Sequence, residues 1–186
     1  LTLLKKVRER DQYVKDGNWR HENLQGTYLG RRQDGYDGIT IGIIGLGRIG
    51  SRLADLLAPW RVRVIAYDPY KGDQQFIHHD VERVELDELL AQSDVVTIHT
   101  NLTAETRQFM GQAEFSKMKE SAYFLNAARG AVVDEDALFE ALDKDVIAGA
   151  AIDVFEEEPL PKQSALLGLG NKILLSPHVI TFNIGA

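Results

Sequence analysis

Hydrophobic residues recur along the chain in short runs that alternate with segments of helical periodicity. The apolar runs, rich in Val and Ile, predict strands at 39–44, 62–67, 95–98, 122–125, 146–152 and 172–175. The helical periodicity predicts helices at 1–16, 48–58, 86–92 and 134–142, with a helical turn at 113–117. Short strands without polar alternation, separated by helices, are typical of a parallel sheet that is covered on both faces. The pattern therefore predicts an α/β fold with a doubly wound parallel sheet and an extra N-terminal helix.

The same pattern predicts local details of packing. The helix at 48–58 is expected to bury the apolar residues that share one face, Ile49, Leu53, Leu56 and Leu57. Asp87 is the expected N-cap of the helix at 86–92. Residues 17–38 are rich in Gly and are expected to form a loop with Trp19 as its main apolar anchor. Residues 156–170 are expected to be an irregular surface connection.

Composition narrows the class of protein. The chain has 186 residues, of which 44% are hydrophobic and 26% charged, as expected for one globular domain without a membrane span. The formal net charge of −7 argues against nucleic acid or an anionic membrane as the main partner. The absence of Cys excludes disulfides and Cys metal sites, and we expect a reducing, cytoplasmic location.

A glycine-rich turn is the strongest single motif. The segment Gly45-Leu46-Gly47-Arg48-Ile49-Gly50 fits G-x-G-x-x-G and lies between a predicted strand and a predicted helix. Gly45 would allow the tight turn, Gly47 the approach of a pyrophosphate, and Gly50 the close packing of helix on strand. The start of the helix then offers free N–H groups to phosphates. This context indicates dinucleotide binding.

An acidic residue completes this motif. Asp68 follows the last glycine by 18 residues, at the end of the second predicted strand. A carboxylate there accepts hydrogen bonds from the ribose hydroxyls and repels a 2′-phosphate, which favours NAD over NADP. The alternative is that these are ordinary turn glycines and a surface acid.

Candidate catalytic residues follow the last three predicted strands. Arg129 follows the fourth strand. It either holds a substrate carboxylate or is a surface residue, and the spacing of the sequence favours neither interpretation over the other. The acidic run at 153–159 is mostly solvated, although one of its carboxylates could orient a histidine. His178 follows the sixth strand and is a plausible general acid and base. We find no cluster of residues with the spacing of a metal site.

Four segments in order resemble one family. Gly45–Gly50, Asn126–Gly130, Asp153–Pro159 and Ser176–His178 together resemble the D-isomer-specific 2-hydroxyacid dehydrogenases. The resemblance covers nearly the whole chain. It implies an NAD cofactor, a Rossmann-type nucleotide-binding domain, and a small 2-keto or 2-hydroxy acid as substrate.

The resemblance also implies catalytic roles. Arg129 would bind and polarise the 2-keto acid. His178 would donate a proton to the carbonyl oxygen during reduction and accept it in the reverse direction. Glu158 would hydrogen-bond His178 and keep it protonated near neutral pH.

The cofactor contacts implied by the resemblance involve five positions along the chain. The backbone N–H groups of Arg48 and Ile49 would meet the pyrophosphate, and Thr100 would lie beside the adenosine. Asp153 and the backbone near Ala127 would hold the nicotinamide carboxamide. One departure is Asn101, which replaces a Pro of the family.

The resemblance finally implies a domain organisation. Residues 1–186 would be an excised NAD-binding domain, with a lead-in helix and loop at 1–38 and the core at 39–186. The substrate-binding domain of the family would be missing, so this chain alone would be inactive, and it is expected to form a homodimer. The alternative to an enzyme is a regulatory module that senses NAD(H) without catalysis. The segment Val179–Asn183 departs from the commonest continuation after the histidine.

Overall fold

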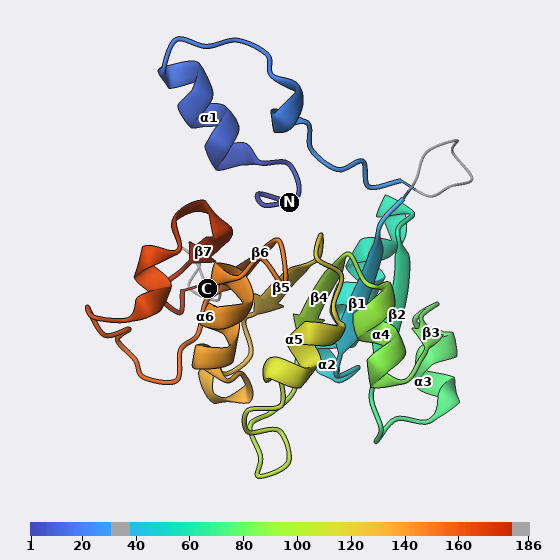
Figure 1. Cartoon of the computed structure of the whole chain (residues 1–186). Coiled ribbons are helices and arrows are strands. Elements are labelled where there is room, and N and C mark those ends of the chain that lie inside the picture. The colour runs from blue at the N-terminus through green and yellow to red at the C-terminus, as the bar shows by residue number, and fades with distance from the viewer. Residues whose placement is uncertain (31–37, 180–186) are drawn as a thin grey trace.

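The chain folds around a single parallel sheet. A computed structural model describes residues 1–30 and 38–179 and contains a seven-stranded sheet with strand order β3-β2-β1-β4-β5-β6-β7 (Figure 1). The strands are β1 (Thr40–Ile44), β2 (Arg63–Tyr67), β3 (Glu82–Arg83), β4 (Val95–Ile98), β5 (Tyr123–Asn126), β6 (Gly149–Ile152) and β7 (Ile173–Leu175). All neighbouring strands in this sheet pair in parallel. The predicted doubly wound α/β class is confirmed.

Helices cover the two faces of the sheet. One apolar cluster packs the sheet against α2 (Arg48–Leu57) and α3 (Asp73–His78). The other packs it against α4 (Leu86–Gln92), α5 (Gln112–Lys117) and α6 (Glu135–Asp143). Short 3-10 helices, η1 (Glu22–Leu24), η3 (Ala58–Trp60), η4 (Gly130–Val132), η5 (Ala165–Gly168) and η6 (Gly170–Lys172), lie in the connections.

Strand β1 shows why the predicted strands are apolar throughout. Its neighbouring residues Ile43 and Ile44 are both fully buried, but they belong to different clusters on opposite faces. Successive side chains of a strand point to opposite faces, so a strand covered on both sides is apolar at every position. The periodicity signal and the architecture therefore have one cause.

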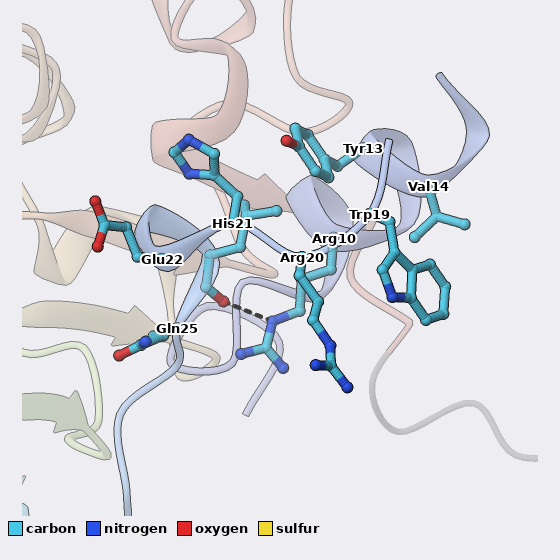
Figure 2. Close-up of a pocket in the computed structure, with 9 residues that line it drawn as sticks. Arg10, Tyr13, Val14, Trp19, Arg20, His21, Glu22 and Gln25 are labelled. Atoms are coloured by element: carbon cyan, nitrogen blue, oxygen red, sulfur yellow. Dashed lines mark hydrogen bonds between the residues drawn. The ribbon is translucent and has the colours of Figure 1, made fainter. Parts of the chain in front are cut away.

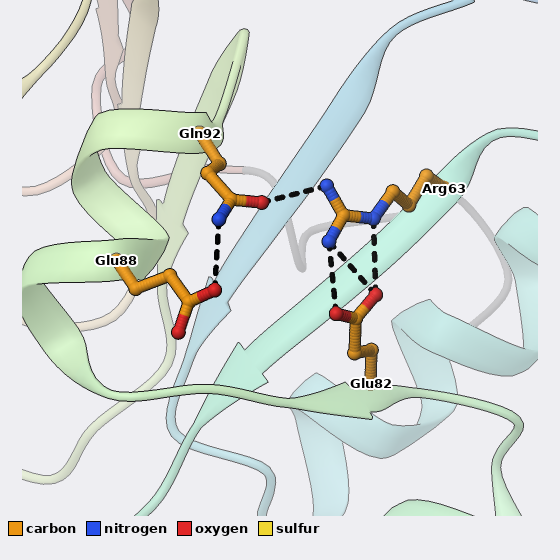
Figure 3. Close-up of polar contacts among 4 residues, drawn as sticks. All are labelled: Arg63, Glu82, Glu88 and Gln92. Atoms are coloured by element: carbon orange, nitrogen blue, oxygen red, sulfur yellow. Dashed lines mark hydrogen bonds and ion pairs between the residues drawn. The ribbon is translucent and has the colours of Figure 1, made fainter.

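The helix and strand at the edge of the sheet were not predicted from sequence. Helix α3 and the two-residue strand β3 lie between β2 and α4, where polar residues mask any periodicity. A polar network fixes this edge: the Arg63 guanidinium donates to both carboxylate oxygens of Glu82 on β3 and to Oε1 of Gln92, and Nε2 of Gln92 donates to Glu88 (Figure 3). The charged residues of this network are exposed, so it is expected to stabilise the fold by only about 1 kcal/mol or less.

The buried face of α2 differs from the prediction. Its buried residues are Gly50, Ser51, Ala54 and Leu57, whereas Ile49 is 66% exposed and Leu56 is also exposed. The helix approaches β1 so closely that a Cβ on Gly50 would lie 2.1 Å from the Gly45 carbonyl oxygen. Small residues permit this approach. Of the four residues predicted to be buried, Leu57 is buried and Leu53 is partly buried, while Ile49 and Leu56 are not.

The predicted N-cap of α4 is also wrong. Glu85 occupies the N-cap position and makes no side-chain cap hydrogen bond, while Asp87 lies in the first helical turn. The Asp87 carboxylate instead accepts a hydrogen bond from the ammonium of Lys117 on α5, at 2.6 Å. An acid in the first turn still favours the helix through the helix dipole.

Most of the N-terminal segment, residues 1–30, lies away from the sheet (Figure 1), although Leu4 and Leu29 pack against the apolar cluster that includes α2. Its helix α1 (Val7–Lys15) has no buried residue, and Trp19 is 75% exposed, so Trp19 does not anchor the loop as predicted. The Arg8 guanidinium donates to the carbonyl of Ile173, the first residue of β7, over 3.1 Å. The segment therefore meets the sheet at the amino ends of its strands.

Other predicted boundaries agree with the structure to within a few residues, although α1 begins at Val7 and β6 at Gly149. The connection at 156–170 is irregular except for η5, whose Leu166 is buried. Within the described residues, no helix combines the length and the hydropathy that a membrane crossing needs. The predictions for residues 31–37 and for the segment after Val179 lie outside the described residues.

Candidate functional site

The predicted site residues all lie at or just beyond the carboxyl ends of the strands. The turn at Gly45 follows β1, Asp68 follows β2, and Thr100 follows β4, which are neighbours in the sheet. Arg129, Asp153 and His178 follow β5, β6 and β7, which are neighbours on the other half. In open parallel sheets, ligands bind at this edge near the point where the strand order reverses, here between β1 and β4.

The glycine turn has the geometry that its sequence requires. Gly45 has a φ of 91°, and a Cβ there would also lie 3.0 Å from the His99 carbonyl oxygen. A Cβ on Gly47 would meet nothing within 4 Å, so the space above it is open. Gly47 is the N-cap of α2, and the first N–H groups of that helix, those of Arg48 and Ile49, have no acceptor within the helix.

A cleft of about 510 Å³ opens beside this turn. Its walls come from the turn, from the loop after β2 and from the loop after β4, so it joins three predicted binding segments. The cleft is lined by Ile44, Gly45, Gly47, Tyr67, Asp68, Pro69, Tyr70, Lys71, His99, Thr100, Asn101, Thr103, Glu105, Thr106 and Phe109. The open glycine surface, the unpaired start of α2 and the carboxylate of Asp68 together fit the adenosine and phosphates of NAD.

Asp68 is fixed by the backbone around it. Its Oδ2 accepts from the N–H of Leu46 in the glycine turn, and its Oδ1 accepts from the N–H of Tyr70, each at 2.9 Å. Each carboxylate oxygen has a second lone pair, so the group can still accept further hydrogen bonds. Thr100 Oγ1 is a buried hydroxyl without a hydrogen-bond partner among the described residues.

The loop after β5 is held by a residue that the sequence did not single out. Asn126 is buried; its Oδ1 accepts from the Ala128 N–H at 3.0 Å, and its Nδ2 donates to the Arg129 carbonyl at 2.9 Å. These bonds fix the backbone under Arg129, whose exposed guanidinium donates to the Ala128 carbonyl at 2.6 Å. The sequence signal that could have identified Asn126 is an Asn at the end of a buried strand, shortly before the candidate residue Arg129.

Glu158 and His178 form a hydrogen-bonded pair. Glu158 Oε2 lies 2.8 Å from His178 Nδ1, and Glu158 Oε1 accepts from the Phe155 N–H at 3.0 Å. These two hydrogen bonds, first that from His178, hold the pKa of Glu158 below its usual value. An ionised carboxylate only accepts, so the ring carries its hydrogen on Nδ1 toward Glu158. The ring atom Nε2 is left for other partners.

Asp153 supports the same segment from β6. It is buried, and its Oδ1 accepts from the N–H of Val179, the residue after His178, at 3.2 Å. His178 has a φ of 55°, a left-handed conformation that is uncommon outside Gly but tolerated by His. The structure thus brings Asp153, Glu158 and His178 together in the segments after β6 and β7. Arg129 lies in the loop after β5, the strand on the other side of β6.

Gly130 brings the loops after β5 and β6 into contact. A Cβ at this position would lie 1.9 Å from the carbonyl carbon and oxygen of Phe155 and 2.4 Å from the N of Glu156. The Glu156 N–H also donates to Glu135 Oε1 at 2.6 Å, which ties the second loop to α6. The backbone beside Arg129 and the backbone beside Glu158 therefore depend on one glycine.

We expect Gly130→Ala to destabilise the chain by about 1–3 kcal/mol, because the methyl group forces the two loops apart. Urea denaturation followed by circular dichroism measures the free energy of unfolding. Gly168→Ala is the matched control, since a Cβ there would meet nothing within 4 Å. Equal stability of the two variants would contradict the close contact of the loops.

Comparison with known proteins agrees with this geometry. Residues 1–179 match the family model described as D-isomer specific 2-hydroxyacid dehydrogenase, NAD binding domain. The D-3-phosphoglycerate dehydrogenase of Archaeoglobus fulgidus is 38% identical over 96% of this chain and 32% of that protein. The glyoxylate reductase of Korarchaeum cryptofilum is 39% identical over 96% of this chain and 52% of that protein.

A solved structure extends the likeness to the fold. The D-lactate dehydrogenase of Aquifex aeolicus, complexed with NAD and lactic acid, superposes with a TM-score of 0.87 at 31% identity. The match covers 98% of this chain and 57% of that chain. The chain thus spans about a third to a little over half the length of these relatives.

Proposed function

Because this chain belongs to the D-isomer specific 2-hydroxyacid dehydrogenase family and matches the NAD-binding domain of that family, we propose that it is the cofactor-binding part of an enzyme that reversibly reduces 2-keto acids to D-2-hydroxy acids. The observation that carries the proposal is the hydrogen-bonded pair of Glu158 and His178, placed on the half of the sheet that also bears Arg129. A domain that only bound the nucleotide would have no need of a proton donor.

The cofactor, when bound in its reduced form NADH, would supply the hydride for the reduction. For the pyrophosphate we propose the tight turn at Gly45, the open surface over Gly47 and the free N–H groups of Arg48 and Ile49. Gly50 allows the close packing of α2 that aims those groups.

The remaining cofactor contacts are proposed at both ends of the dinucleotide. Asp68 would accept from the ribose hydroxyls of the adenosine, and Thr100, in the wall of the same cleft, would lie beside it. Asp153 and the backbone at Ala127 would hold the carboxamide of the nicotinamide. Both follow neighbouring strands, β6 and β5, on the half of the sheet that bears His178.

His178 is the proposed general acid and base. Glu158 accepts from Nδ1, so the ring presents Nε2 for proton transfer to the carbonyl oxygen of the substrate. The hydrogen bond to the carboxylate also fixes the orientation of the ring. In the reverse direction, the neutral Nε2 takes the proton from the hydroxyl group.

Arg129 is the proposed substrate-binding residue. Its guanidinium is exposed at the carboxyl end of β5, and a planar guanidinium binds a carboxylate through two parallel hydrogen bonds. The same charge would draw electron density toward the carbonyl oxygen and so polarise the 2-keto group. Asn126 holds the backbone of this loop, which would limit the positions open to the side chain.

We propose that residues 1–38 are a lead-in helix and loop, that residues 39–186 are the core of the cofactor domain, and that the full-length enzyme has a further domain that completes the substrate pocket. Oxidation of NADH by the full-length enzyme with a panel of 2-keto acids tests the function. We expect turnover with at least one of them. Tight NADH binding without turnover on any 2-keto acid would favour a nucleotide-sensing module.

Asp68→Ala is expected to weaken NADH binding by roughly 10- to 100-fold, because charged hydrogen bonds to the ribose contribute about 1.5–3 kcal/mol. Binding of NADPH should change far less, since the carboxylate that repels a 2′-phosphate is also removed. Isothermal titration calorimetry of the chain with each cofactor measures both. Wild-type chain with equal affinity for NADH and NADPH would contradict this role of Asp68.

A homodimer is proposed to form through the N-terminal segment. Arg10, Tyr13, Trp19 and Leu24 help to line a hollow of about 530 Å³ between α1 and the following loop, and Trp19 points away from the fold (Figure 2). Exposed aromatic residues of this kind are enriched at protein interfaces. Light scattering at micromolar concentration is expected to give twice the monomer mass, and Trp19→Ser should shift it toward the monomer. A monomer at all concentrations for the wild type would contradict the proposal.

A further inference from the structure

A second carboxylate faces the cleft from the wall opposite Asp68. Glu105 lies in the loop after β4 and lines the cleft together with Asp68 and Tyr70 from the loop after β2. The Tyr70 hydroxyl donates a hydrogen bond to Glu105 Oε2, so this bond joins the two walls. The glycine motif and Asp68 assign no role to the carboxylate of Glu105.

Tyr70 contacts both carboxylates. Its backbone N–H donates to Asp68 Oδ1 at 2.9 Å, while its hydroxyl donates to Glu105. The bond to Glu105 and the charge of that residue raise the pKa of Tyr70 above its usual value, which keeps the hydroxyl protonated as a donor near neutral pH. One residue thus orients the acidic groups of both walls.

The loop that carries Glu105 has its own support. Thr106 Oγ1 donates to the Asn101 carbonyl at 2.6 Å and accepts from the Thr103 N–H at 2.7 Å. The glutamate therefore projects from a closed turn. Its position across from Asp68 is determined by the turn on one side and by Tyr70 on the other.

The charges that line the cleft leave an acidic excess. Asp68 and Glu105 are anionic, and Lys71 is the cation among the lining residues. His99 also lines the cleft, and burial lowers its pKa, so it adds no positive charge near neutral pH. A ligand with an additional phosphate at this end would meet two carboxylates and one ammonium.

We propose that Glu105, positioned by Tyr70, is a second determinant of cofactor selection, which rejects a dinucleotide phosphorylated on the adenosine ribose. The proposal rests on the proposed binding of the adenosine at Asp68. Asp68 supplies both attraction to the ribose and repulsion of a phosphate, whereas Glu105 supplies repulsion across the cleft. Selection by two anions on separate loops persists when either one is lost.

Direct binding tests the proposal without catalysis. The Kd of NADH and of NADPH is measured by cofactor fluorescence on the wild-type chain, Glu105→Gln, Tyr70→Phe and Asp68→Ala. Glu105→Gln removes the charge and keeps an oxygen that can accept from Tyr70, and it is expected to tighten NADPH binding about three- to tenfold with NADH within about twofold. Tyr70→Phe keeps the backbone bond to Asp68 and should give a smaller change in the same direction.

Ionic strength provides a second measurement. Charges at an exposed cleft are screened within about 8–10 Å at 0.1–0.15 M salt, so the advantage of Glu105→Gln for NADPH should shrink as salt rises. An unchanged ratio of the two Kd values in Glu105→Gln, or an equal change for both cofactors, would overturn the proposal. If Asp68→Ala also left the ratio unchanged, the proposed adenosine site itself would be wrong. A changed ratio in Asp68→Ala with none in Glu105→Gln would overturn the role of Glu105 alone.

Discussion

His178→Ala in the full-length dehydrogenase is expected to lower kcat for 2-keto acid reduction by roughly 10²- to 10⁴-fold, the contribution of a positioned general acid. The imidazole bound to Glu158 through Nδ1 would be the proton donor, and alanine leaves only water in its place. Steady-state oxidation of NADH at saturating substrate measures the change. The Kd of NADH, measured by titration, is the control and should remain within a few-fold of the wild type.

Glu158→Gln is the matched variant for this experiment. It keeps the side chain's size but has one acceptor oxygen in place of two, so it cannot accept from both the Phe155 N–H and His178 Nδ1, and kcat for reduction should fall because the ring is less well oriented. An unchanged kcat would contradict the role of the pair. If His178→Ala kept a rate near that of the wild type, the proton donor would have to be another group.

The 186-residue chain alone is expected to bind NADH but to reduce 2-keto acids at least about 10³-fold more slowly than the full-length enzyme. The side chains of His178 and Glu158 are 48% and 38% exposed, and Arg129 is exposed as well. In water, charges act weakly on a carbonyl oxygen, and an exposed Arg129 by itself would not hold the substrate in one fixed position. Equal rates for chain and full-length enzyme would show that one wall of the pocket suffices.

The assay compares the two proteins at equal concentration with the same 2-keto acids. Titration with NADH establishes that both bind the cofactor, so that a low rate cannot be attributed to an empty site. Arg129→Ala in the full-length enzyme completes the comparison and is expected to raise KM and lower kcat together, because the residue would contact substrate before and during the reaction.

The sheet could be predicted from sequence because each central strand is buried on both faces. Runs such as that around Ile43 and Ile44 therefore carry an unmistakable apolar signal. Strand β3 carries no such signal, since its residues Glu82 and Arg83 are exposed and the strand is held by a polar contact with Arg63. Hydrophobic periodicity cannot detect an edge that is stabilised in this way.

Packing distance explains the error in α2. The sequence favours the face with the largest apolar residues, but Gly50 permits a close approach at which small residues such as Ala54 face the sheet, while Ile49 is left exposed. Trp19 shows the opposite case, a large apolar side chain that the sheet does not bury. The type of a residue does not show whether another part of the chain will pack against it and bury it.

The site residues were predicted from motif and resemblance, but their supports were not. Asn126 acts through two hydrogen bonds to backbone groups of its own loop, and Gly130 acts through contact with a peptide 25 residues away along the chain. Such roles depend on the relative position of loops in space. The bond between Tyr70 and Glu105 across the cleft belongs to the same class.

The separation of the proposed adenosine cleft, at the ends of β2, β1 and β4, from the pair of Glu158 and His178, after β6 and β7, has a consequence for how such a domain diversifies. Free-energy effects of substitutions that share no partner add nearly independently. A lineage could therefore exchange one dinucleotide for another by altering the loops after β2 and β4, while the acid–base step on the far half stayed intact. The two halves of one sheet can therefore change independently of each other through substitution in their own loops.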